Sequence, residues 1–80
     1  MPYYVYVIKS LSKGTQYVGS ASDVQKRLSD HNAGRSNFTK GYRPWVLVHK
    51  EEFTAKAEAL RRERYLKSGK GREVLKKIIK

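Results

Sequence analysis

Two basic side chains, Arg27 and His31, stand four residues apart in a segment with helical periodicity. Residues at this spacing lie on neighbouring turns of one helix face, so the two side chains can converge on one point. A guanidinium binds phosphate oxygens as a planar fork, and an imidazole donates a hydrogen bond or carries a proton near neutral pH. The pair therefore suits a bound phosphate; the alternative is a solvated Arg27 and a partly buried, structural His31.

One carboxylate, Glu63, follows the apolar Ala59 at helical spacing, which places it on the face expected to pack inward. A buried charge needs a partner, because an unpaired carboxylate in an apolar site costs several kcal/mol. A metal ion or Arg27 would supply the opposite charge. The alternative is a solvated ion pair with Lys67, worth about 0.5 kcal/mol, and Glu58 is the fallback carboxylate.

Two tyrosines, Tyr6 and Tyr17, fall on the two expected strands of a hairpin. A phenol can accept a proton from water if a nearby cation lowers its pKa from about 10. The chain contains six tyrosines, and buried tyrosines commonly serve packing. A role in the core is therefore the alternative for both.

A segment between the expected first helix and third strand interleaves aromatic and basic residues. Aromatic rings stack on bases, and cations neutralise phosphates, so the segment suits nucleic acid. Anchoring of a loop is the alternative. The aromatic residues are Phe38, Tyr42 and Trp45, and the basic ones are Arg35, Lys40 and Arg43.

Charge dominates the composition, since 18 Lys and Arg against 7 Asp and Glu give a formal net charge of +11 over 80 residues. Nucleic acid is the first expected partner, because each neutralised phosphate releases counterions. No apolar run approaches the roughly 20 residues of a spanning helix, so no membrane partner is expected. The absence of cysteine excludes disulfides and thiolate metal sites. With no export signal visible, we expect a cytoplasmic protein.

The first half of the chain predicts strand, strand and helix. An unbroken β-branched and aromatic run over residues 3–8 predicts a central strand covered by a helix on at least one side. After a turn at 13–14, residues 15–19 indicate the returning strand. Ser22 and Gln25 fit a capping box that begins a helix, and residues 33–34 end it.

The second half predicts one more strand and two helices. The strand covers residues 45–48, and Thr54 is expected to cap a helix over 55–67. Gly69 to Gly71 should separate it from a last helix over about 72–79. The order ββαβαα excludes a doubly wound sheet, since only one strand follows a helix. We therefore expect a single small α+β domain over residues 1–80.

Three features of the first half resemble the GIY-YIG nuclease family. They are Tyr-Val-Tyr at residues 4–6, Tyr-Val-Gly at 17–19, and Arg27 ten residues after Tyr17. Residues 18–31 also resemble the family's first helix and its approach, and Ala59 with Glu63 resembles its metal-binding helix. The resemblance extends across the chain and points to small stand-alone bacterial members of the URI-domain type.

The resemblance implies a three-stranded antiparallel sheet flanked by helices, and hydrolysis of nucleic acid through one divalent metal, Mg²⁺ or Mn²⁺. By position, Tyr17 would activate the attacking water and Tyr6 would help arrange the site. Arg27 would stabilise charge on the phosphate, Glu63 would be the carboxylate ligand of the metal, and His31 would lie near the scissile phosphate. DNA is expected over RNA, and its backbone contacts should include Lys26, Arg35, Lys40 and Arg43.

The sequence departs from the family pattern at Tyr4, where the motif has its first glycine, and at Ser20, where repair-type members carry a lysine. It also lacks a counterpart of a C-terminal asparagine found near the metal in several members. Two further hypotheses therefore stand beside the endonuclease: a non-catalytic nucleic-acid-binding module and a basic accessory protein of an assembly. The substrate structure, the pathway and the oligomeric state stay open, with repair, recombination and mobile-element roles all compatible.

Overall fold

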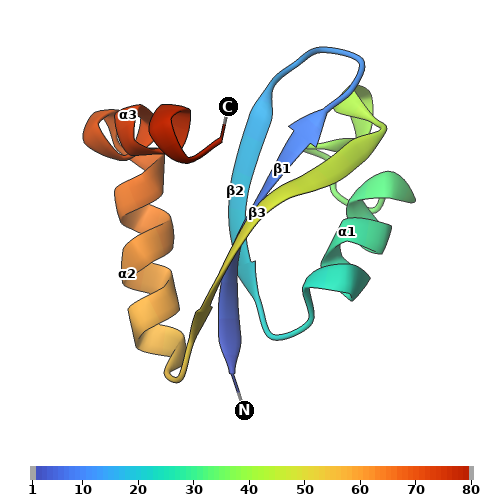
Figure 1. Ribbon diagram of the computed structural model, residues 1–80. Coiled ribbons are helices and arrows are strands. Elements are labelled where there is room, and N and C mark those ends of the chain that lie inside the picture. Colours follow the sequence, from blue (N-terminus) through green and yellow to red (C-terminus); the bar gives the residue numbers. More distant parts are fainter. Residues whose placement is uncertain (1, 80) are drawn as a thin grey trace.

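The structure is a computed structural model that describes residues 2–79, and it places a three-stranded sheet between helices (Figure 1). The predicted order ββαβαα is confirmed. None of the helices in the described range is long and apolar enough to cross a membrane. The elements are β1 (Tyr3–Ser10), β2 (Gln16–Ala21), α1 (Val24–Asn32), the short 3₁₀ helix η1 (Lys40–Tyr42), β3 (Trp45–Phe53), α2 (Lys56–Lys67) and α3 (Gly69–Ile78).

Strand β1 is the centre of the sheet, whose order is β2-β1-β3 with both pairings antiparallel. Val5 and Val7 point to one face and Tyr6 and Ile8 to the other, and at most 1% of each side chain is exposed. A run without polar residues is what a strand covered on both faces requires. The prediction of a central strand is therefore confirmed, and helices cover both of its faces.

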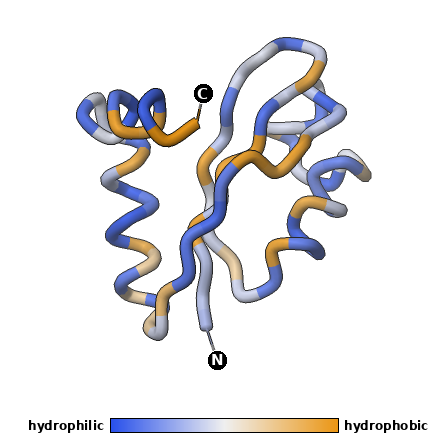
Figure 2. Tube along the Cα trace, in the orientation of Figure 1, coloured by the Kyte–Doolittle hydropathy of each residue, from blue (hydrophilic) through white to orange (hydrophobic). Residues whose placement is uncertain are grey.

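Each face of the sheet has its own hydrophobic core. Helices α2 and α3 cover one face and α1 covers the other (Figure 1); hydrophobic positions gather along the strands and on α3, while α2 is mostly hydrophilic (Figure 2). The core under α2 and α3 consists of Val5, Val7, Val18, Ala59, Leu66 and Leu75. The core under α1 consists of Tyr6, Ile8, Ala21, Val24 and Trp45.

Strand β2 forms one edge of the sheet, and its register decides which side chains face which helices. Tyr17 pairs with Ile8, so it faces α1, whereas Ser20 pairs with Val5 and faces α2. Paired residues of an antiparallel ladder share a face. Because no strand flanks β2 on its outer side within the described residues, groups from both helical layers can meet around this edge.

Two expected helix caps are wrong. Asp23, not Ser22, caps α1, and its carboxylate accepts from the backbone N–H of Lys26 at 3.0 Å. Helix α2 begins after Ala55 without a side-chain cap, while the hydroxyl of Thr54 donates to Glu58 instead. Ser22 and Asp23 are both residue types that cap helices, so the sequence did not decide between them, whereas Ala55 before α2 has no side-chain acceptor.

The expected break at Gly69 to Gly71 is also wrong, because α3 starts at Gly69 and is capped by Ser68. A Cβ atom added at Gly71 would overlap the backbone of Tyr65 and Leu66. This glycine therefore permits close packing of α3 against the end of α2 rather than interrupting a helix. Strand β3 also runs to Phe53, five residues beyond the predicted end.

Candidate active site

A chain of buried hydrogen bonds connects β1, α1 and the loop before η1. The phenol oxygen of Tyr6 lies 3.0 Å from Nε2 of His31, and Nδ1 of His31 lies 2.7 Å from the hydroxyl of Thr39. The indole N–H of Trp45 donates to the carbonyl of Thr39 at 2.9 Å. Tyr6, His31 and Thr39 are at most 1% exposed. Both imidazole nitrogens are therefore occupied, and His31 positions Tyr6 and the loop.

The exposed Arg27 and the buried His31 both neighbour the Tyr6 phenol, His31 through a 3.0 Å hydrogen bond and Arg27 through its charge. Burial raises the pKa of Tyr6, and the neighbouring Arg27 guanidinium opposes that rise. Tyr6 in turn raises the pKa of Arg27. The tyrosine therefore stays protonated near neutral pH, and the guanidinium keeps its full charge next to it.

The carboxylate of Glu63 is half-buried and reaches β2 from α2. The hydroxyl of Ser20 donates to Oε1 at 2.6 Å, and the ammonium of Lys67 donates to Oε2 at 2.8 Å. Burial alone would raise the pKa of Glu63, but the hydrogen bonds from Lys67 and Ser20 outweigh it and hold the pKa below its usual value. The charge partner of Glu63 is thus Lys67 rather than Arg27. The two readings of the sequence both apply, since Glu63 lies on a half-buried face of α2 and forms the ion pair with Lys67.

Tyr17 connects the two halves of the site across the edge of β2. Its ring centroid lies 5.2 Å from that of His31 and 5.7 Å from the ammonium of Lys67. Tyr6, Arg27 and His31 approach this edge from the α1 side, and Glu63 approaches from the α2 side. The five residues predicted to do chemistry therefore form one connected group around β2.

Glu63 is the residue that could hold a divalent metal. Mg²⁺ takes oxygen ligands, keeps several waters, and is commonly bound by one or two carboxylates together with substrate phosphates. Within residues 2–79 no three His, Cys, Asp or Glu side chains gather into a cage. One carboxylate with the Ser20 hydroxyl beside it fits the open mode of Mg²⁺ binding, provided that Lys67 moves off Oε2.

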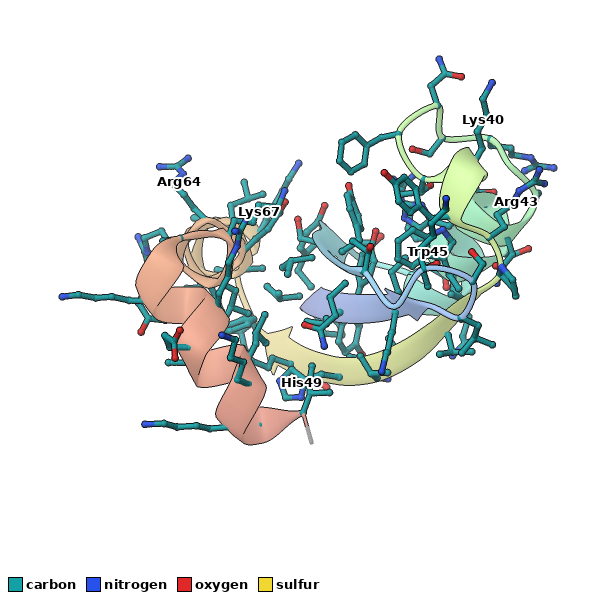
Figure 3. All side chains as sticks on the ribbon, turned by 90° about the horizontal axis from the view of Figure 1, so that it is seen from above. Lys40, Arg43, Trp45, His49, Arg64 and Lys67 are labelled. Atoms are coloured by element: carbon teal, nitrogen blue, oxygen red, sulfur yellow. The ribbon has the colours of Figure 1, made fainter. Side chains whose placement is uncertain are left out.

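Two of the loop cations predicted to bind nucleic acid are engaged in contacts within the protein. Arg43 donates from Nε to the carbonyl of Lys40 at 2.8 Å and packs against Gly34, so it helps to hold the loop. Arg35 pairs with Asp30 at 2.9 Å. Figure 3 shows Lys40 and Arg43 extending from the end of the molecule opposite Lys67.

The remaining residues predicted to contact nucleic acid lie in two places, a hollow beside α1 and the loop before β3. Lys26 and Arg27 line this hollow, of about 420 Å³, which also contains Asp23 and Asp30. Trp45 is 3% exposed and anchors the loop, whereas Phe38 is 75% exposed. The loop-anchoring alternative thus holds for the tryptophan, whereas Phe38 and the 37% exposed Tyr42 present aromatic faces to solvent.

The sequence did not indicate that three further residues contribute to the site. Ser20 entered only as a departure from a motif, Lys67 only as a solvated partner, and Thr39 not at all. Only the spacing of Glu63 and Lys67 carried a usable signal, because an i, i+4 pair predicts contact on one helix. The contacts of Ser20 and Thr39 join segments 43 and 8 residues apart in sequence.

Gly19 is required by the position of Tyr6, and its replacement by alanine should disturb the site. A Cβ atom at residue 19 would lie 2.5 Å from the Tyr6 hydroxyl, which is buried and bonded to His31. Such overpacking costs about 1–3 kcal/mol. We expect Gly19→Ala to lower the free energy of unfolding by that amount in urea titrations, with Gly41→Ala, which meets no atom within 4 Å, nearly neutral.

Folding stability should decline below pH 6.5 because of His31. Burial, with Arg27 next, lowers the pKa of His31 from 6.5, so the unfolded chain binds this proton more readily than the folded one. The stability is therefore complete above about pH 6.5 and falls as pH drops, by at most about 1.4 kcal/mol per pH unit. Urea unfolding followed by Trp45 fluorescence should show this slope, and His31→Gln should flatten it. An unchanged slope in the variant would assign the pH dependence to another group.

Known proteins resemble this chain over most of its length. The family model described as the GIY-YIG catalytic domain matches residues 2–77. The UPF0213 protein VNG_2274C of Halobacterium salinarum is 47% identical over 66 residues, which are 81% of this chain and 84% of that protein. The UPF0213 protein SH2523 of Staphylococcus haemolyticus is 40% identical over 77 residues, or 95% and 93% of the two chains.

A solved structure has the same fold. The solution NMR structure of the UPF0213 protein BH0048 from Bacillus halodurans superposes with a TM-score of 0.59 at 33% sequence identity. The match covers 98% of this chain and 85% of that one. The predicted three-stranded antiparallel sheet with flanking helices is thus confirmed.

Proposed function

Because this chain belongs to the GIY-YIG family, within its UPF0213 group, we propose that it is a metal-dependent endonuclease that hydrolyses phosphodiester bonds in DNA. The family is nuclease-like, and its nucleases generally use divalent metals. The observation that carries the proposal is the group around β2, in which Tyr17 lies between the His31 ring and the Lys67 ammonium that binds Glu63.

Each side chain of the group has a task in this proposal. Tyr17, half-buried at the edge of β2, loses its own proton to solvent and as the phenolate takes the proton from the attacking water. Arg27, exposed and fully charged, offers its planar fork to the phosphate and stabilises the charge that develops during attack. Tyr6 and His31 are buried, so they act as positioning residues that fix the approach of Arg27 and the edge of β2.

Glu63 is the residue assigned to the divalent metal. When bound, such an ion polarises the phosphate and stabilises the leaving oxygen. Ser20 donates to one carboxylate oxygen of Glu63 and thereby fixes the orientation of the carboxylate. Lys67 neutralises Glu63 in the absence of a divalent ion and, once displaced, is free to contact a phosphate.

The second candidate is a nucleic-acid-binding module without turnover. It is favoured by the contacts of Ser20 and Lys67 with the two Glu63 oxygens, because the Lys67 ammonium already neutralises the charge that would attract a metal ion. In this case the positive surface would bind DNA, and divalent metal would have no effect on the integrity of the bound strand.

A salt titration followed by addition of metal tests both candidates. DNA is first bound in EDTA over a range of salt, where log Kd should change with log salt by about 0.9 per phosphate contact. Mg²⁺ or Mn²⁺ is then added to the preformed complex, and we expect shortened strands. An affinity that does not change with salt concentration would contradict the electrostatic part of the proposal. Salt-sensitive binding without shortened strands would favour the binding module.

A further inference from the structure

A hollow of about 650 Å³ lies between the β1–β2 hairpin and helices α2 and α3. This volume is within the range of about 300–1,000 Å³ found for sites that hold small organic groups. Its apolar lining includes Val18, Leu66 and Leu75, which belong to the core under α2 and α3. These three side chains are at most 8% exposed, so they form the floor of the hollow.

Phe38 provides an aromatic wall of the same hollow. Its ring is 75% exposed, and its centroid lies 5.8 Å from that of Tyr17 in a tilted arrangement. The next residue, Thr39, is fully buried and held by His31 and Trp45. The loop backbone next to Phe38 is thus anchored while its ring faces solvent, an arrangement suited to stacking on a ligand.

The other lining residues make the hollow attractive to anions. Lys67, Arg72 and Lys76 contribute three positive charges, and no acidic side chain is among its lining residues. Lys67 is paired with Glu63, and Lys76 with Glu73 by a 3.4 Å contact on the exposed face of α3. The hollow beside Arg27 differs, since Asp23 and Asp30 line it. An aromatic wall, an apolar lining and cations are the features with which proteins hold single-stranded nucleic acid.

We propose that this hollow binds an unpaired nucleotide next to the phosphate to be cut, with its base stacked on Phe38 and its phosphate held by Arg72 and Lys76. Tyr17 and Lys67 belong both to the hollow and to the candidate active site, so the two are continuous. A base within a duplex keeps its faces against its neighbours, so only an unpaired or terminal base offers a face to Phe38. This inference rests on the proposed nuclease function and specifies its substrate as DNA with a single-stranded segment.

Binding in EDTA tests the proposal without any cleavage. The probes are a blunt duplex and the same duplex with a single-stranded overhang that carries 2-aminopurine, whose fluorescence is quenched on stacking. We expect the wild-type chain to prefer the overhang and to quench the probe. Phe38→Leu should weaken overhang binding roughly 5- to 100-fold and abolish the quenching, while Phe38→Trp should retain both.

A matched pair of arginines tests the phosphate contact. Arg72→Ala should lower the slope of log affinity against log salt by about 1 for the overhang probe and reduce the preference for overhang over blunt duplex. Arg61 is exposed on α2 and outside the hollow, so Arg61→Ala should leave the preference for the overhang intact. Equal affinity for blunt and overhang probes, or wild-type quenching in Phe38→Leu, would overturn the proposal. Because no metal is present, this result is independent of whether the chain cleaves DNA.

Discussion

Glu63→Gln is expected to lower the rate of metal-dependent cleavage by roughly 10²–10³-fold, the scale seen when one group that stabilises the transition state is removed. Glutamine keeps the shape of the side chain and an oxygen for the Ser20 hydroxyl, but it removes the negative charge that a divalent ion requires. The measurement is single-turnover cleavage with enzyme in excess, together with Mn²⁺ binding followed by electron paramagnetic resonance. Binding of DNA in EDTA should persist, since the variant removes a negative charge from a positive surface.

Glu58→Gln is the matched comparison for this result. Glu58 lies on the same helix, is exposed, and has a hydrogen bond of 3.3 Å only from Thr54 among the described residues. We expect Glu58→Gln to cleave and to bind Mn²⁺ as the wild type does. The reverse outcome, with Glu58→Gln inactive and Glu63→Gln active, would transfer the metal to the carboxylate that the sequence offered as a fallback.

Arg27→Ala is expected to lower the cleavage rate by a similar factor, roughly 10²–10³-fold, because no other guanidinium lines the hollow beside α1. Arg27→Lys should recover only part of the rate, since an ammonium cannot form the planar fork. Arg27 is exposed, so its loss should leave the fold intact, as Trp45 fluorescence would verify. Single-turnover rates at saturating enzyme separate this effect from weaker binding.

Lys26→Ala is the control for the charge of Arg27. Lys26 lines the same hollow and carries the same charge, but it is assigned to the DNA backbone rather than to the reacting phosphate. We expect this variant to weaken binding and to leave the single-turnover rate at saturation close to that of the wild type. Equal losses of rate in Lys26→Ala and Arg27→Ala would reduce the role of Arg27 to general electrostatic attraction.

The sequence predicted the central strand because the run from Tyr3 to Ile8 contains no polar residue, and only a strand covered on both faces accommodates that. It did not predict the second half of β3, where Lys50, Glu51 and Glu52 interrupt the apolar pattern. These charges are compatible with a strand because β3 is an edge of the sheet. Glu51 is also paired with Arg62 of α2 at 2.8 Å, a contact that no local pattern reveals.

Type and spacing suggested the residues of the candidate site, and the family resemblance suggested their roles, but neither predicted the contacts that hold them in place. His31 is buried, and its two ring nitrogens lie within hydrogen-bond distance of Tyr6 and Thr39; its place near the scissile phosphate stays a prediction. The loop position likewise depends on Asn32, whose amide bonds both the N–H and the carbonyl of Trp45. Such contacts join segments that are separated in the sequence, so the periodicity of a helix or a strand cannot predict them.

The measurement that tests the central claim most directly is cleavage of end-labelled DNA by the wild-type chain, in Mg²⁺ or Mn²⁺ and in EDTA. The panel contains duplex, single-stranded, overhang-bearing and branched DNA, with matched RNA for comparison. We predict internal cuts that require the metal, favour DNA with an unpaired segment, and disappear in both Glu63→Gln and Arg27→Ala. Intact strands on every substrate in both metals, with salt-sensitive binding retained, would contradict the nuclease and leave a DNA-binding module in its place.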